Sequence, residues 1–119
     1  MFRQLNAVIG QAIQHLQSGN SAEAKKKLVY VLNVEPKNIA ALEILGVLCA
    51  QQGDHRQALK HFEKITKIKP DYAGAWSNRG IALQELQQYD QALASYDRAI
   101  RIKSDNAEAC VEYQPNLTP

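Results

Sequence analysis

Residues 76–99 read WSNRGIALQELQQYDQALASYDRA, and the spacing of large and small residues in this stretch occurs twice more upstream. Trp76 is preceded, at intervals of 34 residues, by Leu42 and then Val8. Other positions repeat at the same interval: Gly80, Gly46 and Ala12; Ala92, Ala58 and Ala24; Tyr96, Phe62 and Leu28; Ala99, Ile65 and Val31. A fixed period in this range is typical of proteins built from stacked structural repeats. Such arrays serve as binding surfaces rather than as pockets for chemistry.

The bulk composition is that of one ordinary globular domain. The chain has 119 residues, of which 45% are hydrophobic and 22% charged, and its formal net charge is +2. This length allows one domain with a core, and the charge is too small to indicate a nucleic-acid or membrane partner. No apolar run is long enough to cross a bilayer, and the first residues, MFRQLN, do not form a secretory signal. A cytoplasmic location is therefore the default expectation.

Apolar residues recur at helical spacing between breaks that carry helix-capping residues. Asn38 and Asp54 are good N-caps, and Gly53 suits the end of the helix before it. We expect Asp71 to cap the fifth helix, whereas the last turn has Gln87 where the earlier turns have glycine. No alternating pattern typical of a strand extends beyond a few residues. The predicted helices span residues 5–17, 21–33, 38–51, 55–67, 72–85 and 89–101.

The repeated small residues predict close packing of the two helices in each pair. Bulky residues at Phe62, Trp76 and Tyr96 are then expected to fill the space between neighbouring pairs. We expect Trp76→Ala to cost about 3–5 kcal/mol of unfolding free energy, the usual cost of removing a large buried aromatic side chain. Replacing Gly80 by valine is expected to be damaging because it overpacks the helix pair.

The motif Trp76-x-x-Arg79-Gly80-x-x-Leu83, followed by Ala92-x-x-x-Tyr96 and Ala99, resembles the tetratricopeptide repeat family. The middle unit matches at Leu42, Leu45, Gly46, Ala58, Phe62 and Pro70. The first unit matches less well, because Gln11 and His15 stand where apolar residues are usual. The resemblance covers residues 5–106 and implies an all-α fold of three tandem helix-turn-helix repeats in a right-handed superhelix. It also implies that the first helices of the pairs line a concave groove, which binds a peptide or protein segment.

The repeats are expected at about 5–38, 39–72 and 73–106, with a partial fourth at 107–113, all within one domain of residues 1–113. Pro36 and Pro70 are in phase near the ends of the first two repeats, and Ser104 holds the third position. The segment 105–113 predicts a short C-terminal capping helix that offers Cys110, Val111 and Tyr113 to the helix at 89–101. The pattern fails at Pro115, and residues 114–119 are expected to form an extended tail.

The resemblance further implies which side chains line the groove. Mapped onto this sequence they are Asn6, Ile9, Ile13 and Gln17 from the first helix, Glu43, Val47 and Gln51 from the third, and Ser77, Asn78, Ile81 and Glu85 from the fifth. The mapping describes an apolar stripe (Ile9, Ile13, Val47 and Ile81) rimmed by amides and two carboxylates. One interpretation is that part of the stripe packs within the helix pairs. The other is a seat for an apolar or amphipathic segment, oriented by the polar rim.

Two subtypes of the family can be compared with this groove. Chaperone-binding members clamp an acidic C-terminus with Lys, Asn and Arg side chains, and only Asn78 matches that clamp here. Arrays attached to protein O-glycosyltransferases hold an extended substrate with repeated groove asparagines, whereas Gly10 and Ile44 precede Asn78 at the equivalent positions. The main hypothesis is a protein-binding scaffold, which could be an adaptor module of a larger protein. The substrate-recruiting arm of an O-glycosyltransferase-like enzyme, for which Asn78 is the one matching asparagine, is an alternative.

Nucleic-acid binding is a further alternative. Basic residues collect on the second helices of the pairs: Lys25, Lys26, Lys27, Arg56, Lys60, Lys64, Lys67, Arg98 and Arg101. A basic convex face of this kind could contact phosphates. Acidic residues such as Glu23, Glu63 and Asp97 are interspersed, so a solvated surface is the simpler interpretation.

The sequence offers no catalytic constellation. His15, His55 and His61 share no metal-ligand spacing, and neither a phosphate-binding glycine loop nor a nucleophile motif is present. Cys49 and Cys110 fall on the apolar phase of the repeat, which indicates buried thiols rather than a disulfide. We therefore expect no enzymatic activity, cofactor or metal. The expected partner is a protein or peptide, and a homodimer through the terminal repeat would cover the last apolar face.

Overall fold

The computed structural model describes residues 2–111, and it describes side chains for residues 4–105. Its elements are α1 (Phe2–Gln17), α2 (Ser21–Val34), α3 (Ile39–Gln51), α4 (His55–Ile68), α5 (Ala73–Glu85) and α6 (Tyr89–Val111). No strand occurs in this part of the chain. The helices expected from the sequence agree with these bounds within one residue at most ends, and they differ substantially at the start of α1 and the end of α6.

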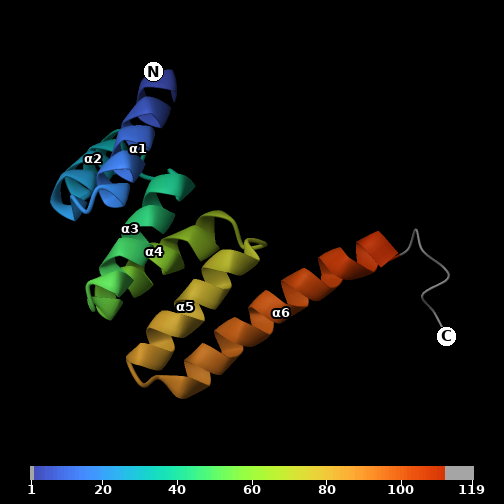
Figure 1. Cartoon of the computed structure of the whole chain (residues 1–119). Helices are drawn as coiled ribbons and strands as arrows, with labels where there is room; N and C mark the ends of the chain where they lie inside the picture. The colour runs from blue at the N-terminus through green and yellow to red at the C-terminus, as the bar shows by residue number, and fades with distance from the viewer. Residues whose placement is uncertain (1, 112–119) are drawn as a thin grey trace.

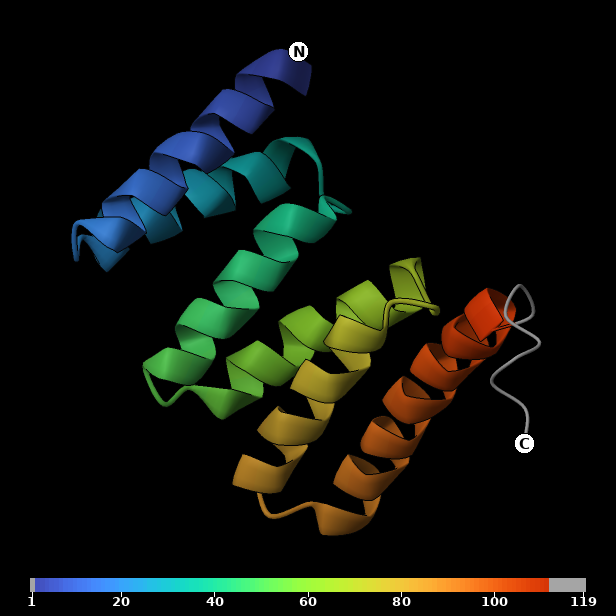
Figure 2. The same ribbon diagram turned by 45° about the vertical axis from the view of Figure 1, so that its right-hand side comes forward.

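The helices form three antiparallel pairs that stack along one direction. Each helix packs against the next in chain order, both within the pairs α1–α2, α3–α4 and α5–α6 and between them. Figures 1 and 2 show the stack, with α1 at one end and α6 at the other. The molecule is correspondingly elongated, with extents of 53 × 37 × 26 Å. The predicted all-α repeat architecture is confirmed.

The three turns within the pairs have the same backbone conformation. Gly19 and Gly53 have φ values of 80° and 83°, and Gln87, at the equivalent position, has a φ of 63°. In the second turn the Asp54 amide donates to the carbonyl of Cys49 at 2.8 Å, and in the third the Gln88 amide donates to Leu83 at 2.9 Å. This bond closes a helix end that needs one left-handed residue, which glycine adopts at least cost. The third turn keeps the geometry although it lacks the glycine.

Side chains cap three of the helices. Asn20, Asn38 and Asp54 accept hydrogen bonds from backbone amides at the starts of α2, α3 and α4. The expected cap at Asp71 is wrong, because α5 begins one residue later and its N-cap is Tyr72. Position 72 is in phase with Asn38, but a tyrosine cannot reach back to the first-turn amides, and no side-chain cap bond forms there.

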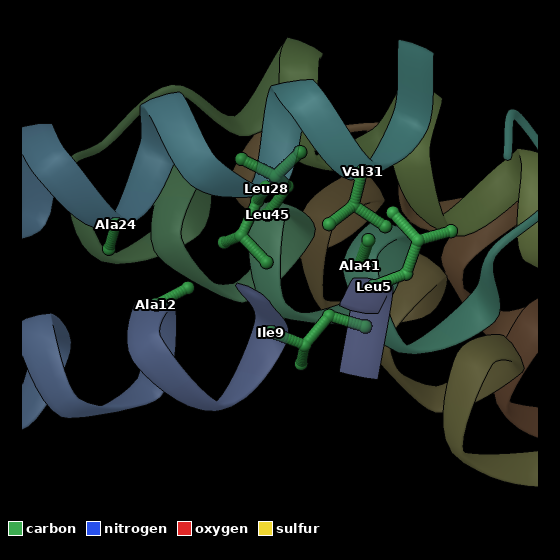
Figure 3. Packing of buried hydrophobic residues seen from close by; sticks show 8 residues of the cluster. All are labelled: Leu5, Ile9, Ala12, Ala24, Leu28, Val31, Ala41 and Leu45. Atoms are coloured by element: carbon green, nitrogen blue, oxygen red, sulfur yellow. The ribbon is translucent and has the colours of Figure 1, made fainter. Parts of the chain in front are cut away.

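The core lies between the helices in two clusters. The first joins the first pair to α3, and its buried side chains are Leu5, Ile9, Ala12, Ala24, Leu28, Val31, Ala41 and Leu45 (Figure 3). The second joins α3 and α4 to α5, and its buried side chains are Leu42, Cys49, Ala58, Phe62, Ile65 and Ala75. Each cluster therefore spans a boundary between repeats, so a repeat is stabilised by its neighbour as well as by its own packing.

Trp76 is not in the core. Its side chain is half-buried, its indole Nε1 donates to the Pro70 carbonyl at 2.8 Å, and the guanidinium groups of Arg79 and Arg98 lie 5.7 and 5.8 Å from its ring. The expectation of a fully buried tryptophan is wrong because the ring sits at the rim of the last pair, where polar side chains rather than another helix cover it. The 3–5 kcal/mol expected for Trp76→Ala therefore needs revision.

The last helix continues past the break expected after residue 101. α6 extends to Val111, so the segment after residue 104 belongs to this helix and is not a separate cap. Pro36 and Pro70 lie shortly after the ends of α2 and α4, whereas Ser104 in the same phase does not oppose helical continuation. The expected packing of Cys110, Val111 and Tyr113, and the tail 114–119, lie outside the residues whose side chains are described.

Candidate functional site

Three apolar side chains occupy the same position in successive repeats, 34 residues apart. Ile13 of α1, Val47 of α3 and Ile81 of α5 have exposed fractions of 40%, 39% and 49%. Exposed branched side chains on three adjacent helices form a continuous apolar stripe rather than scattered surface residues. We call this set the apolar stripe from here on.

The apolar stripe lines two adjoining hollows. The first, of about 450 Å³, lies between α1, α3 and α5, and it is lined by Ile13, Leu16, Gln17, Glu43, Ile44, Val47, Leu48, Gln51 and Asn78. The second, of about 270 Å³, is lined by Val47, Ala50, Gln51, His55, Phe62, Asn78, Ile81, Ala82 and Glu85. Because Val47, Gln51 and Asn78 border both hollows, we treat the two as one groove.

Eight of the eleven groove residues expected from the sequence line this groove. They are Ile13, Gln17, Glu43, Val47, Gln51, Asn78, Ile81 and Glu85. The polar members Gln17, Gln51 and Glu85 are in phase with one another and lie one helical turn beyond the apolar stripe. The periodic sequence thus places an apolar row and a polar row side by side on the same surface.

Three expected residues do not line it. Ile9 is only 8% exposed and packs in the first core cluster with Leu28 and Val31 (Figure 3), so the interpretation that part of the stripe packs within the helices applies to it. Glu43 and Ser77, in phase with Ile9, are half-buried, which shows that an apolar side chain at this position turns inward where polar ones do not. Asn6 is exposed, and neither Asn6 nor Ser77 borders the hollows.

The carboxylate of Glu43 is held by the residue that precedes α5. The Tyr72 hydroxyl donates a hydrogen bond to Glu43 Oε2. This bond, together with burial and the nearby negative charge, raises the pKa of Tyr72 to about 12, so the phenol keeps its proton at neutral pH. The residue that fails to cap α5 therefore positions a carboxylate in the groove.

The second groove carboxylate, Glu85, lies near a histidine. His55 Nε2 is 4.0 Å from Glu85 Oε2, and the exposed fractions of the two side chains are 25% and 55%. His55 Nδ1 is buried without a hydrogen-bond partner. The contact becomes an ion pair only when His55 is protonated, so Glu85 keeps acceptor capacity for an incoming group when the imidazole is neutral.

The arginine of α5 is held by side chains outside the groove. Arg79 of α5 donates to the Ser95 hydroxyl of α6, and its Nη2 lies 3.4 Å from Glu63 Oε2 of α4. Arg79 thus links three helices, and it does not border either hollow. Among the described residues that line the groove there is neither a lysine nor an arginine.

Sequence reasoning missed seven residues that line the groove: Leu16, Ile44, Leu48, Ala50, His55, Phe62 and Ala82. Ile44 occupies the same position in the middle repeat as Asn78 in the terminal repeat. Because Asn78 was predicted to line the groove, the repeat period could have predicted Ile44 as well. Leu16 is half-buried and also packs against the first core cluster. Its helical spacing in the sequence therefore predicts a core residue and gives no sign that it also borders the groove. His55 comes from α4, and only the folded arrangement brings it to a groove made mostly by α1, α3 and α5.

Outside the groove, the described surface carries most of the basic residues. The basic residues expected on α2, α4 and α6 are mostly exposed, and Lys26 pairs with Glu23 at 3.6 Å. In the part of the chain that was searched, no three His, Cys, Asp or Glu side chains gather in a way that could hold a metal ion. Cys49 is buried, and burial raises the pKa of its thiol. No helix in the described residues is both long and apolar enough to span a bilayer.

Comparison with protein families identifies the class. Models of the tetratricopeptide repeat match residues 9–73 and 73–106, and the chain belongs to this family. A comparison with curated proteins finds no match.

Among solved structures, MamA superposes with a TM-score of 0.83 at 20% identity, over 87% of this chain and 61% of MamA. The first repeat domain of Spaghetti (RPAP3), bound to the HSP90 peptide SRMEEVD, gives 0.79 at 19% identity, over 92% of this chain and 87% of that one. An O-GlcNAc transferase mutant from Thermobaculum terrenum gives 0.76 at 24% identity, over 85% of this chain and 19% of the enzyme. At these identities the likeness concerns the fold.

Proposed function

We propose that this chain is a protein-interaction scaffold that binds a peptide or protein segment in the groove between α1, α3 and α5. The observation that carries the proposal is the apolar stripe, three exposed branched side chains at one repeat position, lining two connected hollows. A segment laid across it would bury apolar surface, and the amides of Gln17, Gln51 and Asn78 offer donors and acceptors for its backbone. A structural relative with bound peptide, Spaghetti, supports this mode of use.

Affinity capture with a matched pair of variants tests the groove. Val47→Lys places a charge in the centre of the apolar stripe, at a side chain that is already partly exposed. Val29→Lys makes the same change on α2, at a valine that is also partly exposed and borders neither hollow. We expect Val47→Lys to lose partners that both wild type and Val29→Lys retain. Identical partner sets for all three proteins would exclude the groove as the binding site.

A second candidate is the recruiting arm of a larger enzyme. This chain is similar in fold to about one fifth of the O-GlcNAc transferase chain. In that case the groove would hold a substrate protein while the chemistry takes place elsewhere, in agreement with a scaffold that has no catalytic constellation of its own. The coding sequence that flanks residues 1–119 on both sides decides this, because an in-frame glycosyltransferase domain would establish the arm and a reading frame without one would exclude it.

The outer face of α6 supports a homodimer as a further partner arrangement. Tyr89, Leu93 and Ile100 are exposed on it, in phase with His55, Leu59 and Thr66, which are at least half-buried where α5 covers α4. In an antiparallel pair of α6 helices with Leu93 of one copy against Ile100 of the other, Asp90 meets Lys103. This pairing is self-complementary, as a two-fold interface requires.

Sedimentation equilibrium tests the homodimer. We expect wild type to self-associate and Leu93→Glu to be monomeric at concentrations where wild type is dimeric. Ala94→Glu adds the same charge at an exposed neighbouring position that is turned away from this row, and it is expected to stay dimeric. A wild-type protein that remains monomeric at high micromolar concentration would contradict the arrangement.

A further inference from the structure

The groove carries negative charge although the chain as a whole is positive. The formal net charge is +2, and the exposed lysines and arginines lie mainly on α2, α4 and α6. The described lining of the groove contains two carboxylates, one in each hollow, and no lysine or arginine. Charge is therefore separated between the two sides of the stack, and the groove side attracts cations.

The two carboxylates are placed to meet groups that enter the groove. Tyr72 holds Glu43 in position and uses one of its oxygens, and a carboxylate has acceptor sites beyond a single hydrogen bond. Glu85 is more than half exposed at the far hollow, beyond Val47 and Asn78. Glu43 lies one helical turn before Val47 on α3, and Glu85 lies one helical turn after Ile81 on α5, so one carboxylate stands on each side of the apolar stripe.

We propose that the groove selects an apolar segment that carries lysine or arginine side chains, which pair with Glu43 and Glu85 while the apolar residues contact Ile13, Val47 and Ile81. This inference rests on the proposed function of the groove and names the chemistry of its ligand. An acidic segment would bring its charges against two carboxylates, and the described groove lining offers it no lysine or arginine. Like charges at an interface reject wrong partners, and opposite charges favour encounter with right ones.

Selection from a random library of displayed dodecapeptides on the whole chain tests the ligand chemistry. We expect peptides that bind wild type and fail to bind Val47→Lys to be enriched in lysine and arginine among apolar residues. Their affinity is expected to fall about 3- to 10-fold for Glu43→Gln and again for Glu85→Gln, as for partly exposed charge pairs. Glutamine keeps a carbonyl that accepts the Tyr72 hydrogen bond, so Glu43→Gln preserves the local structure.

A control pair separates local pairing from overall charge. Glu23→Gln combined with Asp97→Asn removes two negative charges from residues outside the groove, and it is expected to leave peptide affinity unchanged. Peptides that depend on Val47 but lack cations, or are acidic, would overturn the inference and leave the proposed groove function intact. Failure to obtain any peptide that depends on Val47 would instead contradict the groove function itself, and with it the inference.

Discussion

The middle repeat (α3 and α4) and the terminal repeat (α5 and α6) have the same pattern of large and small residues. The equivalent large side chains are buried to different extents in the two repeats. Leu42 is fully buried and Phe62 is 2% exposed, whereas their counterparts Trp76 and Tyr96 are half-buried. The middle repeat packs between α2 and α5, and no helix of the described chain covers the outer face of α6. The repeat period therefore specifies where a side chain stands, and the neighbouring repeats decide whether it is buried.

The largest expected difference in unfolding free energy between the two repeats concerns Leu42 and its equivalent, Trp76. Leu42→Ala is expected to cost about 2–5 kcal/mol, the usual range for removing a fully buried leucine. Trp76→Ala is expected to cost only about 1–2 kcal/mol, because part of the ring is in water and its flanking cations contribute weakly at exposed sites. Urea denaturation of both variants measures the difference. Equal losses would mean that the terminal repeat is packed as tightly as the middle one.

The contact between a glycine of the first helix and an aromatic ring of the second helix can also be compared between the two repeats. A Cβ at Gly46 would lie 2.7 Å from Phe62 Cε1, and one at Gly80 would lie 2.8 Å from Tyr96 Cε1. The Phe62 ring is confined in the core, whereas the half-buried Tyr96 ring has room to shift toward solvent. We expect Gly46→Ala to cost about 1–3 kcal/mol through overpacking. In Gly80→Ala, the helical preference of alanine over glycine, about 1 kcal/mol, offsets most of the clash.

Thermal denaturation of the two alanine variants measures this difference in sign and size. A larger loss for Gly80→Ala than for Gly46→Ala would contradict the idea that the terminal ring is the more adaptable one. Gly80→Val, which the sequence predicts to overpack the helix pair, is still expected to be damaging, because its extra methyl groups meet the Tyr96 ring even after the ring shifts.

The fold was predictable from the sequence because small and large residues recur at fixed helical positions, and packing of repeats allows few alternatives. In the middle repeat, for example, the small residues Gly46 and Ala58 and the large residue Phe62 stand at the positions that indicate two closely packed helices. The site was predictable only in outline, since the burial of Ile9 depends on where α2 and α3 meet α1. The bond from Tyr72, at the start of α5, to Glu43 of α3 joins residues 29 apart, and neither composition nor spacing indicates it.

The turns differ between the repeats by one residue, and this difference predicts a stabilising substitution. Gln87 has a φ of 63° where Gly53 has 83°, and a side chain in this left-handed region costs about 1–2 kcal/mol. Gln87→Gly is expected to gain about 0.5–1 kcal/mol after the added flexibility of the unfolded chain is subtracted. Gly53→Gln is expected to lose a similar amount. Opposite shifts in melting temperature would confirm that both turns need the same conformation.

The smallest expected effect concerns His61 in the middle repeat, whose equivalent in the terminal repeat, 34 residues later, is Ser95. Ser95 accepts a hydrogen bond from Arg79, whereas His61 Nδ1 is buried without a partner. Burial, with the nearby charges of Lys64 and Lys25, lowers the pKa of His61 below its ordinary 6.5. The unfolded chain therefore binds a proton more readily than the folded one, and stability falls as the pH drops from 6.5 toward the folded-state pKa.

One proton limits this slope to about 1.4 kcal/mol per pH unit, and a partly exposed imidazole gives less. Measured between pH 7.5 and 5, the unfolding free energy of His61→Gln is expected to decline less steeply than that of wild type. His15→Gln, on the first repeat, serves as the control, because His15 is half-buried like His61 but has no buried ring nitrogen that lacks a hydrogen-bond partner. If the two variants show the same pH slope as wild type, the unpartnered imidazole does not make the middle repeat sensitive to acid.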